Sequence, residues 1–164
     1  VGPKGGVLAQ NNEVSASRYG KDLARRLEAQ GLEAIESRVE ELDALSLESE
    51  SLDAVFLVKF YHDTVWMGVD RPEMLRRIRD SLNPDGVFLV VDHAAEAGVG
   101  LTEVSGLHRI EEATLIAEVE AAGFRLAARS SLLANSGDDR TSNVFRSRVR
   151  GNTDRFMLRF DPAK

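Results

Sequence analysis

The sequence predicts an α/β protein built on a mostly parallel β-sheet, and three patterns support this prediction. Short apolar runs alternate with segments that carry apolar residues at helical spacing. Two of the runs, residues 52–59 and 86–91, are rich in Val, Phe and Leu, which is typical of strands buried on both faces. Two further strand patterns, residues 124–133 and 155–160, follow the last helical segment, and we expect them to form an antiparallel pair.

Length and composition exclude several classes of function. A chain of 164 residues is suited to a single domain, which we predict to cover residues 1–164. The absence of cysteine excludes disulfides, thiolate metal ligands and cysteine nucleophiles. A net charge of −6 argues against nucleic acid as the main partner, and no apolar run approaches the ~18 residues of a membrane span.

The first third of the chain predicts a strand and an amphipathic helix. The strand covers residues 6–10, and the helix runs from a cap at Ser15 or Ser17 to about residue 30. Its apolar side chains recur at three- and four-residue spacing and are expected to be buried, namely Tyr19, Leu23, Ala24 and Leu27.

A second, more polar strand follows this helix. Gly31 is placed to end the helix, and residues 32–39 then alternate weakly between apolar and polar side chains. Such alternation favours an edge strand. The acidic residues from Glu40 to Ser51 are expected to form a surface connection.

The middle of the chain predicts a helix between the two apolar strands. Residues 64–69 are expected to form a loop that contains Trp66. Asp70 and Pro72 mark the start of the helix, and Asn-Pro-Asp-Gly at residues 83–86 predicts a turn before the second strand. The buried stripe of the helix is expected to comprise Met74, Leu75, Ile78 and Leu82.

The last third predicts one more helix and a long loop. The helix covers about residues 111–122, with Leu115, Ile116 and Val119 facing inward, and Gly123 ends it. About twenty polar residues, 134–153, separate the last two strands. Loops of this length are usually lids, binding loops or disordered segments, and we expect Asp138, Asp139 and Arg140 to be solvated.

Polar and ionisable residues follow both apolar strands. Tyr61, His62 and Asp63 come after the first strand, and Asp92 and His93 after the second. Ligands of open α/β sheets bind outside the carboxyl ends of the strands. The sequence therefore predicts a functional site at these two strand ends.

The chain resembles the class I S-adenosylmethionine-dependent methyltransferases. The order of elements, the Asn-Pro-Asp-Gly turn and the terminal strand pair carry this resemblance over nearly the whole chain. Residues 61–66 (Tyr-His-Asp-Thr-Val-Trp), residues 91–93 (Val-Asp-His) and residues 107–109 (Leu-His-Arg) more narrowly resemble a little-characterised bacterial branch of predicted methyltransferases.

The resemblance implies a Rossmann-like sheet of strand order 3-2-1-4-5-7-6, in which the seventh strand is antiparallel. The first strand and its glycine-rich loop have no counterpart here, so we expect a domain truncated at its N-terminus. Unpaired strand edges then predict self-association. The cytoplasm is the favoured location, while the periplasm and secretion stay open because the natural N-terminus is expected to lie upstream.

The resemblance also implies S-adenosylmethionine as the cofactor. Where the family holds the ribose with a carboxylate, this chain has Gln10 and Asn11. Glu40 and Glu41 occupy the region that contacts adenine in the family. The methyl-donor end of the cofactor is expected to lie against the residues after the fourth family strand, Lys59, Phe60 and Tyr61.

The predicted catalytic residues are His62, Asp63 and His93. Either histidine serves as a general base in this hypothesis, oriented by Asp63 or Asp92. A divalent metal held by the histidines and an aspartate is the less favoured alternative, because the spacings are long and irregular, and we expect no metal. The predicted substrate-binding residues are Trp66, Asp92, His108 and Arg109. For Trp66 packing in the core is favoured over stacking, and Arg109 is equally suited to cap the following helix.

Two functions from different classes remain open. The first is methyl transfer to a small-molecule acceptor. The second is a non-catalytic, methyltransferase-like domain or fragment that serves in interaction without binding the cofactor. A nicotinamide-dependent oxidoreductase is third, because it also requires a glycine-rich first turn.

Overall fold

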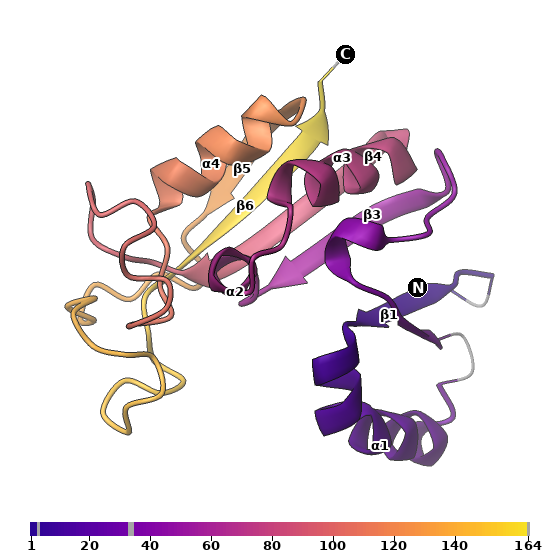
Figure 1. Cartoon of the computed structure of the whole chain (residues 1–164), viewed down its shortest axis with the longest axis horizontal. Helices are drawn as coiled ribbons and strands as arrows, with labels where there is room; N and C mark the ends of the chain where they lie inside the picture. Colours follow the sequence, from indigo (N-terminus) through magenta and orange to yellow (C-terminus); the bar gives the residue numbers. More distant parts are fainter. Residues whose placement is uncertain (3, 33–34, 164) are drawn as a thin grey trace. The chain divides into compact units, whose positions relative to one another are not determined.

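The computed structural model describes residues 1–2, 4–32 and 35–163, and it divides into two compact units. The units are Val1–Ser46 and Leu47–Lys164. Each unit has its own sheet, and the described strands form a two-stranded and a four-stranded sheet that do not pair with each other (Figure 1). Whether the two units act as one domain stays a prediction.

The described residues of the N-terminal unit form two parallel strands, one long helix and one short 3-10 helix. The elements are β1 (Val7–Asn11), α1 (Glu13–Gln30), β2 (Ile35–Val39) and η1 (Leu42–Ala44). Val7 pairs with Ile35, and the register continues to the ends of both strands. Gly31 ends α1 with a left-handed φ of 59°, as expected. Residues 33–34 of the predicted second strand lie outside the described residues.

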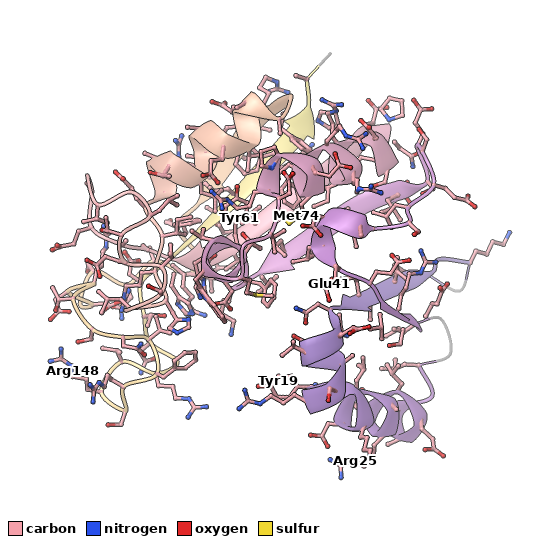
Figure 2. The ribbon with its side chains drawn as sticks, in the orientation of Figure 1. Tyr19, Arg25, Glu41, Tyr61, Met74 and Arg148 are labelled. Atoms are coloured by element: carbon pink, nitrogen blue, oxygen red, sulfur yellow. The ribbon has the colours of Figure 1, made fainter. Side chains whose placement is uncertain are left out.

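Two expectations for α1 are wrong. The N-cap is Asn12, whose Oδ1 accepts the backbone N–H of Ser15 at 2.9 Å, so the helix starts earlier than either predicted serine cap. Tyr19 and Ala24 are exposed, although the side chains of Leu23 and Leu27 are half-buried. Figure 2 shows the Tyr19 side chain projecting away from α1. Two short strands offer too little surface to cover the predicted face of an 18-residue helix.

In its described residues, the C-terminal unit contains a four-stranded sheet and three helices. The strands are β3 (Leu52–Val58), β4 (Leu82–His93), β5 (Phe124–Ser130) and β6 (Arg155–Pro162). The helices are α2 (Tyr61–Trp66), α3 (Arg71–Ser81) and α4 (Glu112–Ala121). The strand order is β3-β4-β6-β5, with β3 and β4 parallel and β6 antiparallel to both neighbours. This arrangement confirms the α/β class and the antiparallel terminal pair.

The core of this unit lies between one face of the sheet and the helices. Figure 1 shows α2, α3 and α4 along one side of the sheet. Phe88 of β4 packs its ring against Phe124 and Phe160, whose centroids lie 5.4 and 6.2 Å away. The fully buried residues include members of both layers, namely Met74, Phe88, Val90, Leu115, Val119, Leu158 and Phe160.

The prediction that β3 is buried on both faces is wrong. β3 pairs only with β4 among the described strands and therefore lies at the edge of its sheet. Phe56 and Val58 are 67% and 51% exposed. They alternate with Val55 and Leu57, which point to the same face as the buried Phe88 and Val90. The helices of this unit cover only that face.

The Asn-Pro-Asp-Gly segment lies inside β4 as a bulge. Leu52 pairs with Leu82, and the next pairing joins Ala54 to Val87, so the segment bulges out of the ladder. A Cβ added at Gly86 would lie 2.9 Å from the carbonyl oxygen of Asn83, which explains the need for glycine.

The helices of this unit mostly follow the predictions. Asp70 caps α3 by accepting the N–H of Glu73 at 3.1 Å. Residues 64–69 differ, because residues up to Trp66 belong to the short helix α2 instead of a loop. In the described part of the chain, no helix has both the length and the apolar content needed to cross a membrane.

Substitution of an exposed apolar side chain of β3 tests the prediction that the chain self-associates through this edge strand. Val58→Lys places a charge on the exposed apolar face of the edge strand, so we expect it to lower the associated fraction at a given concentration. Sedimentation velocity over a concentration series measures this fraction. Leu132→Lys is the matched control, because Leu132 is 78% exposed but lies outside the sheet. A parent chain that is monomeric at every concentration would contradict the prediction.

Candidate functional site

The three histidines of the chain converge beside the carboxyl ends of β3 and β4. His62 lies in α2, which begins three residues after β3 ends, and His93 is the last residue of β4. His108 comes from the loop before α4. The ring centroid of His62 is 5.9 Å from that of His93 and 5.4 Å from that of His108. This is the convergence that the strand-end pattern predicts.

The carboxylate of Asp92 holds His62 in place. Asp92 is completely buried at the end of β4. Its Oδ1 lies 2.7 Å from His62 Nδ1, and its Oδ2 accepts the backbone N–H of His62 at 2.9 Å. Its Oδ1 also accepts the N–H of His93 at 2.7 Å. Because Nδ1 faces this carboxylate, the Nε2 atom of His62 is directed to the opposite side.

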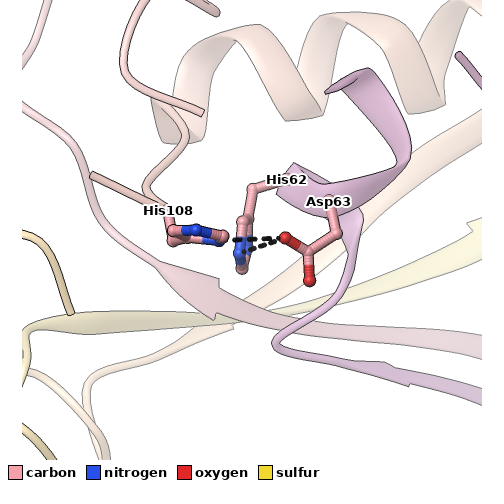
Figure 3. A group of neighbouring side chains, drawn as sticks. All are labelled: His62, Asp63 and His108. Atoms are coloured by element: carbon pink, nitrogen blue, oxygen red, sulfur yellow. Dashed lines mark hydrogen bonds and ion pairs between the residues drawn. The ribbon is translucent and has the colours of Figure 1, made fainter. Parts of the chain in front are cut away.

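The carboxylate of Asp63 lies on that opposite side and joins the cluster. Its Oδ1 is 3.0 Å from His62 Nε2 and 3.1 Å from His108 Nδ1 (Figure 3). The same oxygen accepts the indole N–H of Trp66 at 2.9 Å. One carboxylate oxygen is therefore shared by three nitrogen-bearing rings.

His108 is held by its backbone and by aromatic neighbours. Its φ is +56°, a conformation that side-chain-bearing residues adopt rarely and that recurs at functional sites. Its ring meets the ring of Phe145 edge-on at 4.9 Å and that of Trp66 at 6.3 Å. Trp66 is itself 52% exposed, so the favoured prediction that it packs in the core is wrong.

The pKa values of His62 and His93 move in opposite directions. Burial alone would lower the pKa of His62, but hydrogen bonds with Asp63 and Asp92 outweigh it and raise the pKa to about 9. Burial lowers the pKa of His93 to about 4 despite the nearby Asp92 charge. His93 Nδ1 lies 2.7 Å from the hydroxyl of the buried Thr153. At neutral pH the site thus pairs a protonated His62 with a neutral His93.

Arg109 is part of the scaffold of the long loop. Its guanidinium is completely buried and pairs with Asp138 at 2.9 Å, and it also donates to the carbonyl oxygens of Ala94 and Ser142. The expectation that Asp138 is solvated is therefore wrong. Asp138 Oδ2 also accepts the N–H of Asp154 at 2.6 Å, which ties the loop to the start of β6.

Tyr61 also lies inside the C-terminal unit. Its side chain, labelled in Figure 2, is completely buried. Its hydroxyl donates to Glu118 Oε2 at 2.7 Å, and Arg71 pairs with the same carboxylate through two nitrogens. Burial and the Glu118 charge raise the pKa of the Tyr61 hydroxyl. The side chain of Tyr61 therefore bridges α2 to α4.

The residues next to Tyr61 form the turn between β3 and α2. Lys59 has a left-handed φ of +55°, and its N–H donates to the carbonyl oxygen of Val91 at 2.6 Å. Phe60 occupies the N-cap position of α2. The backbone of this turn is thus fixed against the end of β4.

The predicted cofactor residues of the N-terminal unit lie at the carboxyl ends of its two strands. Gln10 Nε2 donates to the carbonyl oxygen of Glu40 at 2.5 Å. Glu41 Oε1 accepts the N–H of Glu13 at 3.2 Å, and Glu40 Oε2 accepts the N–H of Ser46 at 3.0 Å. Asn11 is the last residue of β1.

Several residues that complete the cluster carry no recognisable signal in the sequence. Thr153 is sixty residues from its partner His93, and Phe145 is a lone aromatic residue in a polar loop. The ion pair between Arg71 and Glu118 likewise joins two helices through residues that are 47 positions apart in the sequence. Only the apolar character of Phe145 in polar surroundings offered a local signal.

Comparisons with known proteins identify the family. The sequence model of the family described as "Methyltransferase domain" matches residues 7–90, which is just over half of the chain. The chain therefore belongs to the methyltransferase domain family. No curated protein matches it.

Solved structures with similar folds agree with this assignment. A SAM-dependent methyltransferase from Aquifex aeolicus aligns with a TM-score of 0.67 at 17% identity, over 98% of this chain and 70% of that chain. The glycopeptide N-methyltransferase MtfA aligns with a TM-score of 0.64 at 13% identity, over 96% and 72%. The [4+2]-cyclase SpnF aligns with a TM-score of 0.62 at 12% identity, over 98% and 76%. At these identities the similarity establishes the fold.

The opposite pKa shifts of the two histidines predict a distinctive titration. We expect the ring of His62 to lose a proton near pH 9, and that of His93 to gain one only near pH 4. Because the pKa of His62 is raised on folding, its contribution to stability is present below pH 6.5 and is lost as pH rises through 9. Ring resonances in an NMR titration measure both values, and His62→Gln is the assignment control. Titration of the His62 and His93 rings near pH 6.5 would contradict the prediction.

Proposed function

We propose that this chain transfers a methyl group from S-adenosylmethionine to a small-molecule acceptor. The observation that carries this proposal is the family match over residues 7–90, combined with an ionisable cluster at the carboxyl ends of β3 and β4. This is the edge at which open α/β sheets bind ligands. The acidic net charge of −6 favours a small acceptor over nucleic acid.

The residues at the strand ends of the N-terminal unit carry hydrogen-bonding groups that suit the polar parts of the cofactor. A carboxylate accepts up to about four hydrogen bonds, and Glu40 and Glu41 each make only one in the contacts described above. Such oxygens suit ribose hydroxyls and an adenine amine, and Gln10 and Asn11 add amide groups. The cofactor supplies an electrophilic methyl group on a positively charged sulfur when bound.

In the C-terminal unit the proposed cofactor contacts come from the turn after β3. Lys59 and Phe60 lie in a backbone conformation fixed by Val91. Because the hydroxyl of Tyr61 is engaged by Glu118, the proposed contribution of Tyr61 is its backbone. The hydrogen bond of its side chain to Glu118 anchors the turn to α4.

Catalysis in this proposal depends mainly on holding the acceptor in line with the methyl group. His93 is the better general base of the two histidines, because its lowered pKa keeps the ring neutral at pH 7. His62 is protonated at that pH and balances the charges of Asp63 and Asp92. Its proposed role is electrostatic.

The proposed acceptor contacts come from the more exposed side of the cluster. Trp66 offers a half-exposed indole, and the side chain of His108 is 21% exposed beside it. Asp92 and Arg109 contribute indirectly, since both are completely buried. Asp92 positions His62, and Arg109 holds the loop that carries Phe145 and Thr153.

A non-catalytic, methyltransferase-like domain is the second candidate. One similar structure is named as a [4+2]-cyclase, so this fold also serves proteins that are not named for methyl transfer. The separation of the described strands into two sheets also favours this candidate. Cofactor binding distinguishes the two candidates.

Calorimetry with S-adenosylmethionine tests the proposal. We expect the chain to bind one equivalent, and Glu41→Gln to weaken binding by roughly fivefold or more, since a neutral amide accepts weaker hydrogen bonds than a carboxylate. Glu36→Gln is the matched control, because Glu36 lies on the exposed face of β2 and pairs with Arg38. The absence of binding by the folded chain would overturn the proposal and leave the non-catalytic candidate.

A further inference from the structure

The shared oxygen of Asp63 is the starting point for a second kind of chemistry at this cluster. Asp63 Oδ1, His62 Nε2 and His108 Nδ1 face one another, and their potential ligand atoms all lie within 4.8 Å (Figure 3). Two imidazoles and one carboxylate are the donor set of many metal sites with open coordination positions. His62, Asp63 and His108 thus direct three potential metal ligands at one point.

We propose that His62, Asp63 and His108 bind a divalent transition-metal ion of the iron-to-zinc series. The proposal replaces the expectation from the sequence that the chain holds no metal. It goes beyond methyl transfer, because the metal would bind whether or not the chain is a methyltransferase.

The spacing of the donors fits an ion between them. Ligands bound at about 2.1 Å and separated by about 90° at the metal lie about 3.0 Å apart. Asp63 Oδ1 is 3.0 Å from His62 Nε2 and 3.1 Å from His108 Nδ1. Both separations are thus close to those of adjacent ligands on one ion.

Asp92 supports the proposed metal ligand His62 through the ring nitrogen that does not face Asp63. Metal-binding histidines usually donate their second ring N–H to a carboxylate or a carbonyl group, which fixes the ring and strengthens the ligand. His62 directs Nδ1 to the buried Asp92 at 2.7 Å, so its Nε2 is held toward Asp63.

The ligand set also indicates which ions bind. Imidazole nitrogen suits Zn²⁺, Co²⁺, Ni²⁺ and Fe²⁺, whereas Mg²⁺ and Ca²⁺ prefer oxygen ligands throughout. The side chains of Asp63 and His108 are 20% and 21% exposed, which gives an ion access from solvent. Three protein ligands leave positions for water or for an oxygen atom of a small molecule.

The only tryptophan of the chain lies beside the proposed site and reports on it. Trp66 Nε1 is 2.9 Å from Asp63 Oδ1. We expect Co²⁺ to quench the fluorescence of Trp66 with a stoichiometry of one, and Zn²⁺ to compete with Co²⁺ for the site. The titrations use the chelator-treated chain without S-adenosylmethionine, so a failure of the methyltransferase proposal does not affect them.

Variants separate specific binding from binding elsewhere. Asp63→Asn and His108→Ala should each weaken Zn²⁺ binding in calorimetry at least tenfold. His93→Gln is the matched control and should bind within about twofold of the parent, because His93 lies outside the ligand set although its ring is 5.9 Å from that of His62. Mg²⁺ should give no heat.

A measurement on the unaltered chain avoids dependence on folding of the variants. Co²⁺ should broaden the ring NMR resonances of His62 and His108 before any others. The absence of Zn²⁺ and Co²⁺ binding would overturn the proposal. Binding that leaves these two rings unaffected, or that survives unchanged in folded Asp63→Asn and His108→Ala, would overturn it as well.

Discussion

The buried carboxylate of Asp92 is the constraint on which the candidate site depends. It accepts the backbone N–H groups of His62 and His93 and lies 2.7 Å from the ring nitrogen Nδ1 of His62. Breaking a buried, hydrogen-bonded ion pair by removing one partner costs about 3–5 kcal/mol. The interaction therefore fixes the start of α2 against the end of β4, and it orients the His62 ring at the same time.

The remaining parts of the site follow from this fixed point. Asp63 comes directly after His62 in α2, so the orientation of the helix places its carboxylate beside Nε2 of His62. The loop that carries His108 is held from the other side by the buried pair of Arg109 and Asp138. Two buried charge pairs thus bring a short helix and two loops to one point. The proposed base and the proposed metal ligands depend on this geometry.

Sequence patterns predicted the features that depend on local chemistry. The Asp70 cap, the glycine at residue 86 and the strands before His62 and His93 each follow from the intrinsic preferences of a few neighbouring residues. The strand-end rule also predicts that His62 and His93 lie near each other. The resemblance to methyltransferases supplied the family, which the sequence comparison confirms.

Local sequence patterns do not predict features that depend on residues far apart in the chain. Asp138 looks like a loop residue of a solvated surface, and only its pairing with Arg109, 29 residues away, buries it. Phe56 has the character of a core residue, but its burial depends on which faces of the sheet the helices cover. The shared oxygen of Asp63 likewise depends on side-chain orientations that spacing does not encode.

An NMR titration of Asp92→Asn tests the central role of this carboxylate most directly. The substitution keeps the shape of the side chain and removes its charge, which is among the causes that raise the pKa of His62. We expect the pKa of His62 to fall from about 9 by roughly one unit or more, and its ring to lose its fixed orientation. A pKa that stays near 9, with an unchanged ring environment, would contradict the claim that Asp92 organises the site.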